Sequence, residues 1–179
     1  APEGALPRVL LAVFSRAGEN YWNGGRRVLE VGNTDVVAGM IRDSLEVEHY
    51  RIEAADPYPF EYEPTVQRNW SEVQAGARPS LAAAPPGLNG IDTVLLGSPV
   101  WASQTPMIMR TFVEAVGGFA GLTVHPFVTY AVSGFGSVPD DYAALCPDAT
   151  FGEGLTVRGE NATGAAPEVR GWLARIGLI

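Results

Sequence analysis

The sequence predicts a three-layer α/β fold, in which a parallel sheet of about five strands carries helices on both faces. Apolar runs such as Val9–Phe14 are too continuous for a sheet with one face in water. These runs alternate along the chain with segments of helical periodicity. The length of 179 residues fits one domain, which we place at residues 8–179 after a disordered lead-in at residues 1–7.

The first half of the chain is predicted to form a β-α-β unit followed by a polar segment. Residues 8–15 form a buried strand, and apolar side chains then recur at helical spacing from Val36 to Leu45. Residues 46–53 alternate as an edge strand does. The stretch 56–90 is rich in turn formers around a helix at 65–74, which carries Val66, Trp70 and Val73 on one face.

The second half continues the alternation. We expect strands at 91–97, 124–132 and 155–158, and helices at 105–116 and 167–176. Ser137 is expected to cap a short helix that ends at Leu145. Asp140 and Asp141 are assigned to the N-terminus of that helix, and acid–base work by this pair is the less favoured alternative.

Composition excludes several classes of protein. The net charge is −8 and all twelve basic residues are arginines scattered along the chain, which argues against a nucleic-acid surface. No apolar run approaches the roughly 20 residues that a membrane span needs. Cys146 is the single cysteine and is interpreted as a packing residue, and neither His49 nor His125 belongs to a metal motif.

The cellular compartment is open on the sequence alone. The chain begins at Ala1 without methionine. We favour a cytoplasmic location, with export after removal of a signal as the alternative.

Three unusual loops follow the central strands. A sheet of this kind with strand order 2-1-3-4-5 binds ligands beyond the carboxyl ends of its strands at the switch point. The loops that meet there are SRAG with its remote partner GNT, then SPVWASQTP, and then SGFGSVPDDY. In these loops the chain resembles the flavodoxin family, whose fold is the flavodoxin-like three-layer sandwich, with an insertion in the phosphate loop. The resemblance runs from Arg8 to Leu178.

The resemblance implies that the protein binds FMN. Ser15, Arg16 and Ala17 would form one wall of a phosphate site, and Asn33 and Thr34 the other. Free amides at a helix N-terminus suit a phosphate without any lysine. Between these walls, residues 19–31 are predicted to form an inserted hairpin with a tight turn at Asn23-Gly24. Its residues Tyr21 and Trp22 either pack the hairpin onto the surface, which we favour, or close over the cofactor.

The other two loops would hold the flavin ring. We expect Trp101 to stack on it, whereas Phe135 either covers the other face or packs under the following helix. The predicted ring-binding residues are Ser98, Pro99, Val100, Trp101, Ala102, Ser103, Ser133, Gly134, Phe135 and Gly136. Many flavodoxins carry a glycine in the first of these loops that turns toward the reduced flavin. Here Ala102 or Ser103 would take that conformation at a cost of about 1 kcal/mol or more.

Two redox functions and one non-redox function remain open. The favoured one is an electron carrier between protein partners, which the acidic charge and the absence of a nucleotide fingerprint support. The alternative is an NAD(P)H-dependent reductase of quinones or similar small acceptors, which the glycine-free loop supports. In both, the cofactor performs the redox chemistry and no side chain is assigned a catalytic role. A domain of this fold without cofactor, serving as an interaction module, is the second alternative.

Overall fold

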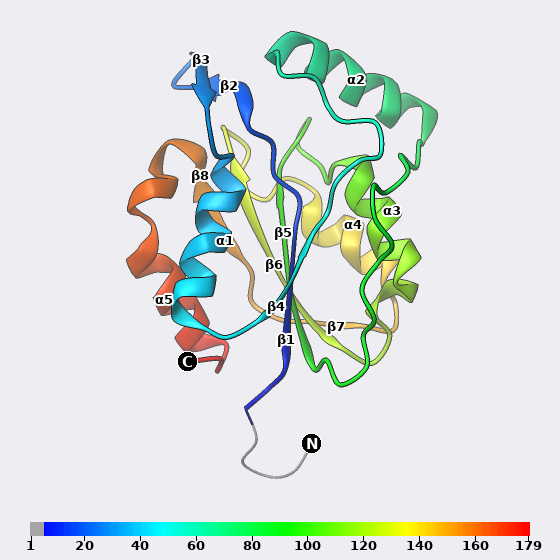
Figure 1. The fold of residues 1–179 in the computed structure, drawn as a ribbon, viewed down its shortest axis with the longest axis vertical. Helices are drawn as coiled ribbons and strands as arrows, with labels where there is room; N and C mark the ends of the chain where they lie inside the picture. Colours follow the sequence, from blue (N-terminus) through cyan, green and yellow to red (C-terminus); the bar gives the residue numbers. More distant parts are fainter. Residues whose placement is uncertain (1–5) are drawn as a thin grey trace.

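The computed structural model describes residues 6–179, so most of the predicted lead-in lies outside the described residues. Its centre is a parallel sheet in the order β4-β1-β5-β6, followed by β7 and β8, which both pair with β6 (Figure 1). The strands are β1 Val9–Val13, β4 Glu48–Arg51, β5 Thr93–Pro99, β6 Thr123–Tyr130, β7 Thr150–Phe151 and β8 Leu155–Arg158. Because β7 and β8 together occupy the fifth place, the predicted order 2-1-3-4-5 is confirmed.

Helices cover both faces of this sheet. Helix α1, Asn33–Ser44, and helix α5, Ala166–Arg175, lie on one face, and α3, Met107–Ala115, and α4, Val138–Leu145, on the other (Figure 1). Alternate residues of β1 enter the two cores: Leu11 packs in the α1–α5 layer with Trp172, and Leu10 in the α3–α4 layer with Phe112. Continuous burial along β1 is therefore the result of two cores, as predicted. Short 3₁₀ turns, η1 Gly117–Phe119 and η2 Gly159–Gly164, complete the chain.

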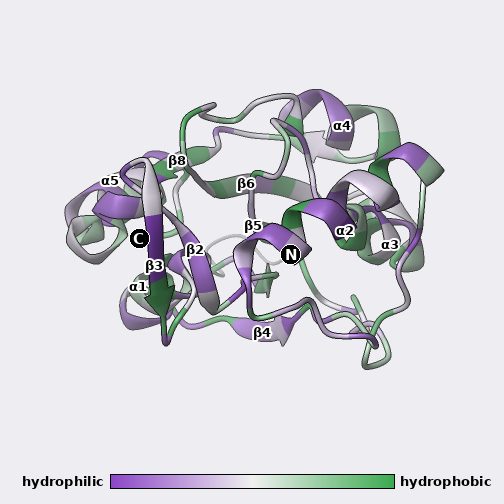
Figure 2. Ribbon diagram, turned by 90° about the horizontal axis from the view of Figure 1, so that it is seen from above, coloured by the Kyte–Doolittle hydropathy of each residue, from purple (hydrophilic) through white to green (hydrophobic). Residues whose placement is uncertain are grey.

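Two elements stand beyond the layers, at the carboxyl ends of the strands. The hairpin of β2, Gly18–Trp22, and β3, Gly25–Leu29, rises from the end of β1 on the α1 side. Helix α2, Tyr62–Ala75, lies across the same end on the α3 side (Figure 2). The predicted hairpin is confirmed, and its turn residues Asn23 and Gly24 both have positive φ, as such a turn requires.

Several local predictions need correction. The edge strand is shorter than predicted, and the strand Thr150–Phe151 was missed. In α2 the buried residues are Thr65 and Asn69, whereas Trp70 is 50% exposed, because this helix meets the end of the sheet instead of its face. Ser137 occupies the N-cap position of α4 but makes no capping hydrogen bond.

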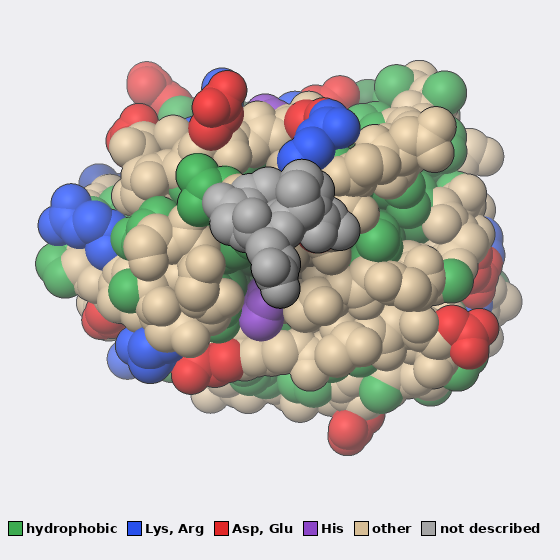
Figure 3. All heavy atoms as spheres, turned by 90° about the horizontal axis from the view of Figure 1, so that it is seen from below, with side chains coloured by type: hydrophobic (Ala, Val, Ile, Leu, Met, Phe, Trp, Pro, Cys, Tyr) green, Lys and Arg blue, Asp and Glu red, His purple; other side chains and the backbone are tan. Residues whose placement is uncertain are grey.

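The face opposite the hairpin and α2 carries a mixed surface where the structure describes it. Seen from below, the arginine and acidic side chains of the described residues are scattered among apolar and neutral ones (Figure 3). None of the helices in residues 6–179 combines the length and the apolar character that a bilayer span requires.

Candidate functional site

Two adjoining cavities open at the carboxyl ends of β1, β5 and β6. The first, about 110 Å³, lies against the start of α1, and the second, about 340 Å³, lies beneath α2. They share the aromatic residues Tyr21, Tyr62 and Trp101, so they adjoin at these rings as two parts of one cleft. This is the switch point of the sheet, where the sequence places the site.

The start of α1 is held by a residue far away in the sequence. Ser15 Oγ accepts a hydrogen bond from the backbone N–H of Asp35 at 3.1 Å, which is the bond that a capping side chain usually accepts. Gly32 occupies the N-cap position and cannot be larger, because a Cβ there would overlap Ser15 Oγ. The two predicted walls of the phosphate site therefore touch each other.

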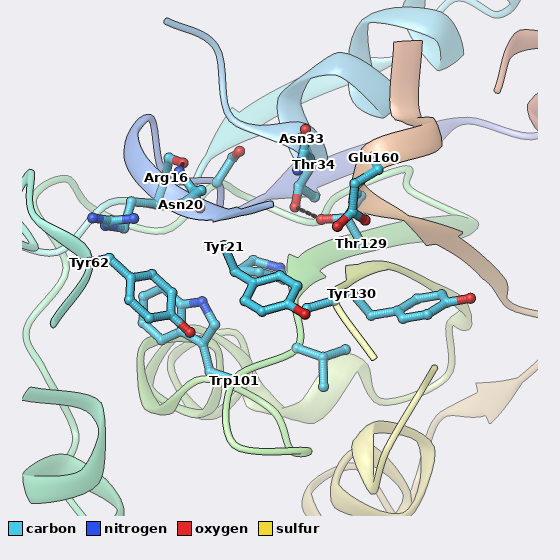
Figure 4. Close-up of a pocket in the computed structure, with 15 residues that line it drawn as sticks. Arg16, Asn20, Tyr21, Asn33, Thr34, Tyr62, Trp101, Thr129, Tyr130 and Glu160 are labelled. Atoms are coloured by element: carbon cyan, nitrogen blue, oxygen red, sulfur yellow. Dashed lines mark hydrogen bonds between the residues drawn. The ribbon is translucent and has the colours of Figure 1, made fainter. Parts of the chain in front are cut away.

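A pair of buried hydroxyls forms the floor of the first cavity. Thr34 Oγ1, in the first turn of α1, lies 2.6 Å from Thr129 Oγ1, near the end of β6. Thr34 is 1% exposed and Thr129 is 5% exposed, yet both line the cavity. Because one hydroxyl donates to the other, the accepting hydroxyl keeps its own proton free for a ligand. Figure 4 shows this pair beside Asn33 and Glu160, with the rings of Tyr21, Tyr62 and Trp101 on the other side of the cleft.

Arg16 lines the cleft, but its guanidinium is engaged by backbone. It donates to the carbonyl oxygens of Glu19, Pro59, Phe60 and Glu61 at 2.6–3.1 Å. These contacts bind the hairpin to the segment that enters α2. Burial lowers the pKa of Arg16, and the nearby carboxylate of Glu19 opposes that shift. The arginine therefore binds the two segments that cover the cleft to each other. Within the described part of the chain, the first cavity has no other cation in its lining.

Glu160 brings a carboxylate to the first cavity. Its Oε1 accepts from the backbone N–H of Asn23 at the hairpin tip at 2.8 Å, and its Oε2 accepts from Arg158 Nε at 3.2 Å. Burial raises its pKa, but the hydrogen bond from Asn23 and the charge of Arg158 outweigh it, so the pKa lies below its ordinary value. The ionised carboxylate thus holds the hairpin tip over this end of the cleft by a hydrogen bond.

Trp101 forms one wall of the second cavity. Its indole meets the rings of Phe14 and Tyr58 edge to face, with centroids 5.3 and 5.0 Å apart. The backbone then reverses at once: Trp101 and Gln104 exchange two hydrogen bonds of 3.1 and 3.0 Å. Between them Ala102 and Ser103 both have positive φ, 52° and 60°. Two residues other than glycine therefore adopt a strained backbone conformation beside the second cavity.

The next loop is tied to this turn. Ser103 O accepts from Ser137 N at 2.8 Å, and the backbone at Gly136 packs so closely on Ser103 that a Cβ would overlap it. Asp141 Oδ2 accepts from Thr105 N at 3.0 Å and from Ser137 Oγ at 3.1 Å. It also pairs with Arg110 at 3.3 Å. Asp141 therefore joins the two loops, a role beyond the helix N-terminus to which the sequence assigned it.

The predicted site residues fall into three groups. The first cavity is lined by Ser15, Arg16, Asn33, Thr34, Pro99, Val100 and Trp101. The second cavity is lined by Arg16, Val100, Trp101, Ala102, Ser103 and Ser133. Ser98, Ala17, Gly134, Phe135 and Gly136 line neither. Ser98 is buried, Ala17 faces a groove on the outer side of α1, and Phe135 packs against the core.

Other lining residues were not predicted. They come from the hairpin, from α2, from the end of β6 and from η2. They are Asn20, Tyr62, Thr65, Val66, Asn69, Trp70, Thr129, Tyr130, Ala131, Val132, Gly159 and Glu160. Tyr21, which we expected to pack the hairpin onto the surface, lines both cavities, whereas Trp22 packs under Arg27 of the hairpin.

Comparison with known proteins agrees with this geometry. A family model described as flavodoxin matches residues 29–176. The chain belongs to the flavodoxin family. No curated protein matches this flavodoxin sequence. Among residues 6–179 no group of three or more His, Cys, Asp or Glu side chains could hold a metal ion.

Solved structures resemble this flavodoxin over nearly its whole length. A protein assigned as a flavoprotein from Bacteroides uniformis ATCC 8492 is 25% identical, with a TM-score of 0.74, over 95% of this chain and 99% of that chain. One from Bacteroides eggerthii DSM 20697 is 24% identical, with a TM-score of 0.75, over 96% and 99%. A flavoprotein from Lactobacillus acidophilus NCFM, in complex with FMN, is 14% identical, with a TM-score of 0.65, over 92% and 99%.

Proposed function

We propose that this flavodoxin binds FMN non-covalently and carries electrons between protein partners. The observation that carries the proposal is that a hydroxyl-lined cavity at the start of α1 adjoins an aromatic cavity beside Trp101. The start of α1 and the hydroxyl pair offer a phosphate hydrogen bonds and partial positive charge, which the Glu160 carboxylate in the same lining opposes. The second cavity suits a flat ring. The FMN complex of the Lactobacillus acidophilus relative supports this choice of flavin.

The residues present fit this cofactor. The first amides of α1, the hydroxyl of Ser15 and the Thr34–Thr129 pair would hold the phosphate, for which a helix N-terminus supplies partial positive charge. Trp101 would lie against the ring. Bound FMN would supply the electron transfer, and the chain would orient it and exclude water from its phosphate end.

Transfer to another protein is supported by the surface around the cleft. Phe60, Trp70 and Val132 are 57%, 50% and 77% exposed, and Trp70 and Val132 also line the second cavity. An apolar rim on a chain of net charge −8 suits brief docking of a basic redox protein, because charge steers the encounter.

A second function is supported by a different observation. Helix α2 and the hairpin roof the cleft, which suits a small acceptor better than a protein. The glycine-free turn at Ala102 and Ser103 is also a departure from many flavodoxins. The second candidate is therefore an NAD(P)H-dependent reductase of quinones or similar small acceptors.

Flavin binding and anaerobic reduction test these functions in turn. Addition of FMN to flavin-free protein should quench tryptophan fluorescence, and Trp101→Ala should bind FMN more weakly and shrink the quenching step. Failure of the wild-type protein to bind FMN would leave the cofactor-less interaction module. Stepwise reduction of a carrier should give, at half-reduction, a spectrum unlike those of the oxidised and fully reduced flavin. Bleaching by NADH or NADPH within seconds, without that spectrum, would instead establish the reductase.

A further inference from the structure

Helix α2 brings to the second cavity a buried polar atom that has no hydrogen-bond partner in the described part of the chain. Asn69 lines this cavity, is 5% exposed, and its Oδ1 has no hydrogen-bond partner among residues 6–179. Leaving a buried amide oxygen unpaired is costly, and buried polar groups without a partner are few in folded proteins. A residue of this kind that faces a cavity is explained if a ligand supplies the missing partner.

The surroundings of Asn69 restrict that ligand. From the same helix, Val66 and Trp70 line the cavity with apolar surface. The hydroxyl of Thr65 is already engaged, because it donates to the carbonyls of Pro59 and Glu61. Thr65 and Asn69 are the buried residues of α2, and of these two Asn69 keeps, among the described residues, an unpaired polar atom for a ligand.

The charge and shape of the second cavity further restrict the ligand that it can bind. Among residues 6–179, Arg16 is the only charged side chain in its lining, and its guanidinium is bound to backbone carbonyls. Trp101 on the wall and Trp70 at the rim favour a flat group. The cavity thus suits a neutral, planar ring system whose edge carries hydrogen-bonding groups.

We propose that Asn69 binds the pyrimidine edge of the flavin ring, on which C=O and N–H groups stand side by side. A carboxamide presents an acceptor and a donor in the same arrangement, which is why asparagine reads the edges of bases in nucleic acids. The terminal torsion of asparagine is broad, so the amide can turn to match that edge. The inference rests on the proposed binding of FMN, and it makes α2 part of the cofactor site.

The test removes each side of the contact separately. Lumiflavin, which is the ring without ribityl or phosphate, and 3-methyllumiflavin, which lacks the N3–H donor, are titrated into the flavin-free protein. Wild type should prefer lumiflavin, and Asn69→Leu should weaken lumiflavin roughly tenfold and lose most of that preference. Gln67→Leu, which changes an exposed amide on the same helix, is the matched control and should behave as wild type.

Stability supplies an independent readout. Because Asn69→Leu removes an unpaired buried amide, the flavin-free variant should melt at or above the temperature of wild type, whereas a merely structural asparagine would lose stability on replacement. If leucine does not fit, Asn69→Ala gives the same comparison of the two flavins.

The outcomes separate this inference from the proposed function. If wild type binds FMN but Asn69→Leu binds lumiflavin equally well, or keeps the full preference against 3-methyllumiflavin, the role of Asn69 is refuted and FMN binding stands. If wild type binds neither FMN nor lumiflavin, the proposed function fails first.

Discussion

The buried hydroxyl pair of Thr34 and Thr129 allows folding stability and phosphate binding to be separated. Thr34→Val leaves Thr129 Oγ1, which lies on a residue 5% exposed, without its partner at 2.6 Å. An orphaned buried hydroxyl costs about 1–3 kcal/mol. For a chain of this size that corresponds to a fall in melting temperature of roughly 2–12 °C. The double variant Thr34→Val, Thr129→Val removes both polar groups and should recover most of that loss, because no orphan remains.

The same variants should lose affinity for phosphate. A hydrogen bond to a charged group is worth about 1.5–3 kcal/mol, so we expect FMN to bind roughly 10- to 100-fold more weakly to the double variant. Riboflavin, which has no phosphate, should bind nearly as it does to wild type. Calorimetric melting and fluorescence titration of both flavins measure the two effects. A double variant with wild-type stability and wild-type FMN affinity would show that the pair only joins α1 to β6, and equal losses for both flavins would refute the phosphate contact.

Three further predictions concern the loops and the single thiol. Ala102→Gly should stabilise the protein by about 1 kcal/mol in denaturant unfolding, because Ala102 has φ 52°, whereas Ala143→Gly inside α4 should destabilise it by a similar amount; two losses would contradict the strain. Asp141→Ala should lower the free energy of unfolding by about 1.5–3 kcal/mol and weaken FMN, while the exposed Asp140→Ala should change little; equal effects would refute the joining role. Burial raises the pKa of Cys146 to about 11, so its thiol stays protonated at pH 8 and should react with iodoacetamide only after unfolding; rapid labelling of the native protein would contradict this.

The sheet and the position of the cleft at its edge could be predicted because they depend on local pattern. Runs such as Val9–Phe14 indicate strands buried on both faces, and parallel strands with helical crossovers leave few possible orders. The Asn23-Gly24 pair sets the hairpin turn by its own conformational preference. The loops that follow parallel strands meet at the same edge of the sheet, and this does not depend on the contacts of their side chains.

The features that could not be predicted depend on tertiary contacts between elements that are far apart in the sequence. Periodicity gave α2 an apolar stripe through Val66 and Trp70, but it did not indicate that the helix would lie across the sheet end and bury Asn69. Glu160 reaches the hairpin tip from 137 residues away, a distance over which no sequence pattern operates. The sequence around Thr129, near the end of a strand, does not indicate that its hydroxyl contacts the hydroxyl of Thr34.

The bond from Asp35 N–H to Ser15 Oγ has a consequence for the order of folding. Starting a helix is unfavourable until its first turn is stabilised, and here the stabilising oxygen belongs to Ser15, in the loop that follows β1. The first turn of α1 should therefore become stable only after β1 has packed beside it. This requires closure of a loop of about twenty residues. A peptide of residues 30–45 should be poorly helical at that end. The amides that would bind a phosphate are therefore oriented only when the tertiary fold forms. Destabilising β1 should accordingly lower ligand affinity before the whole chain unfolds.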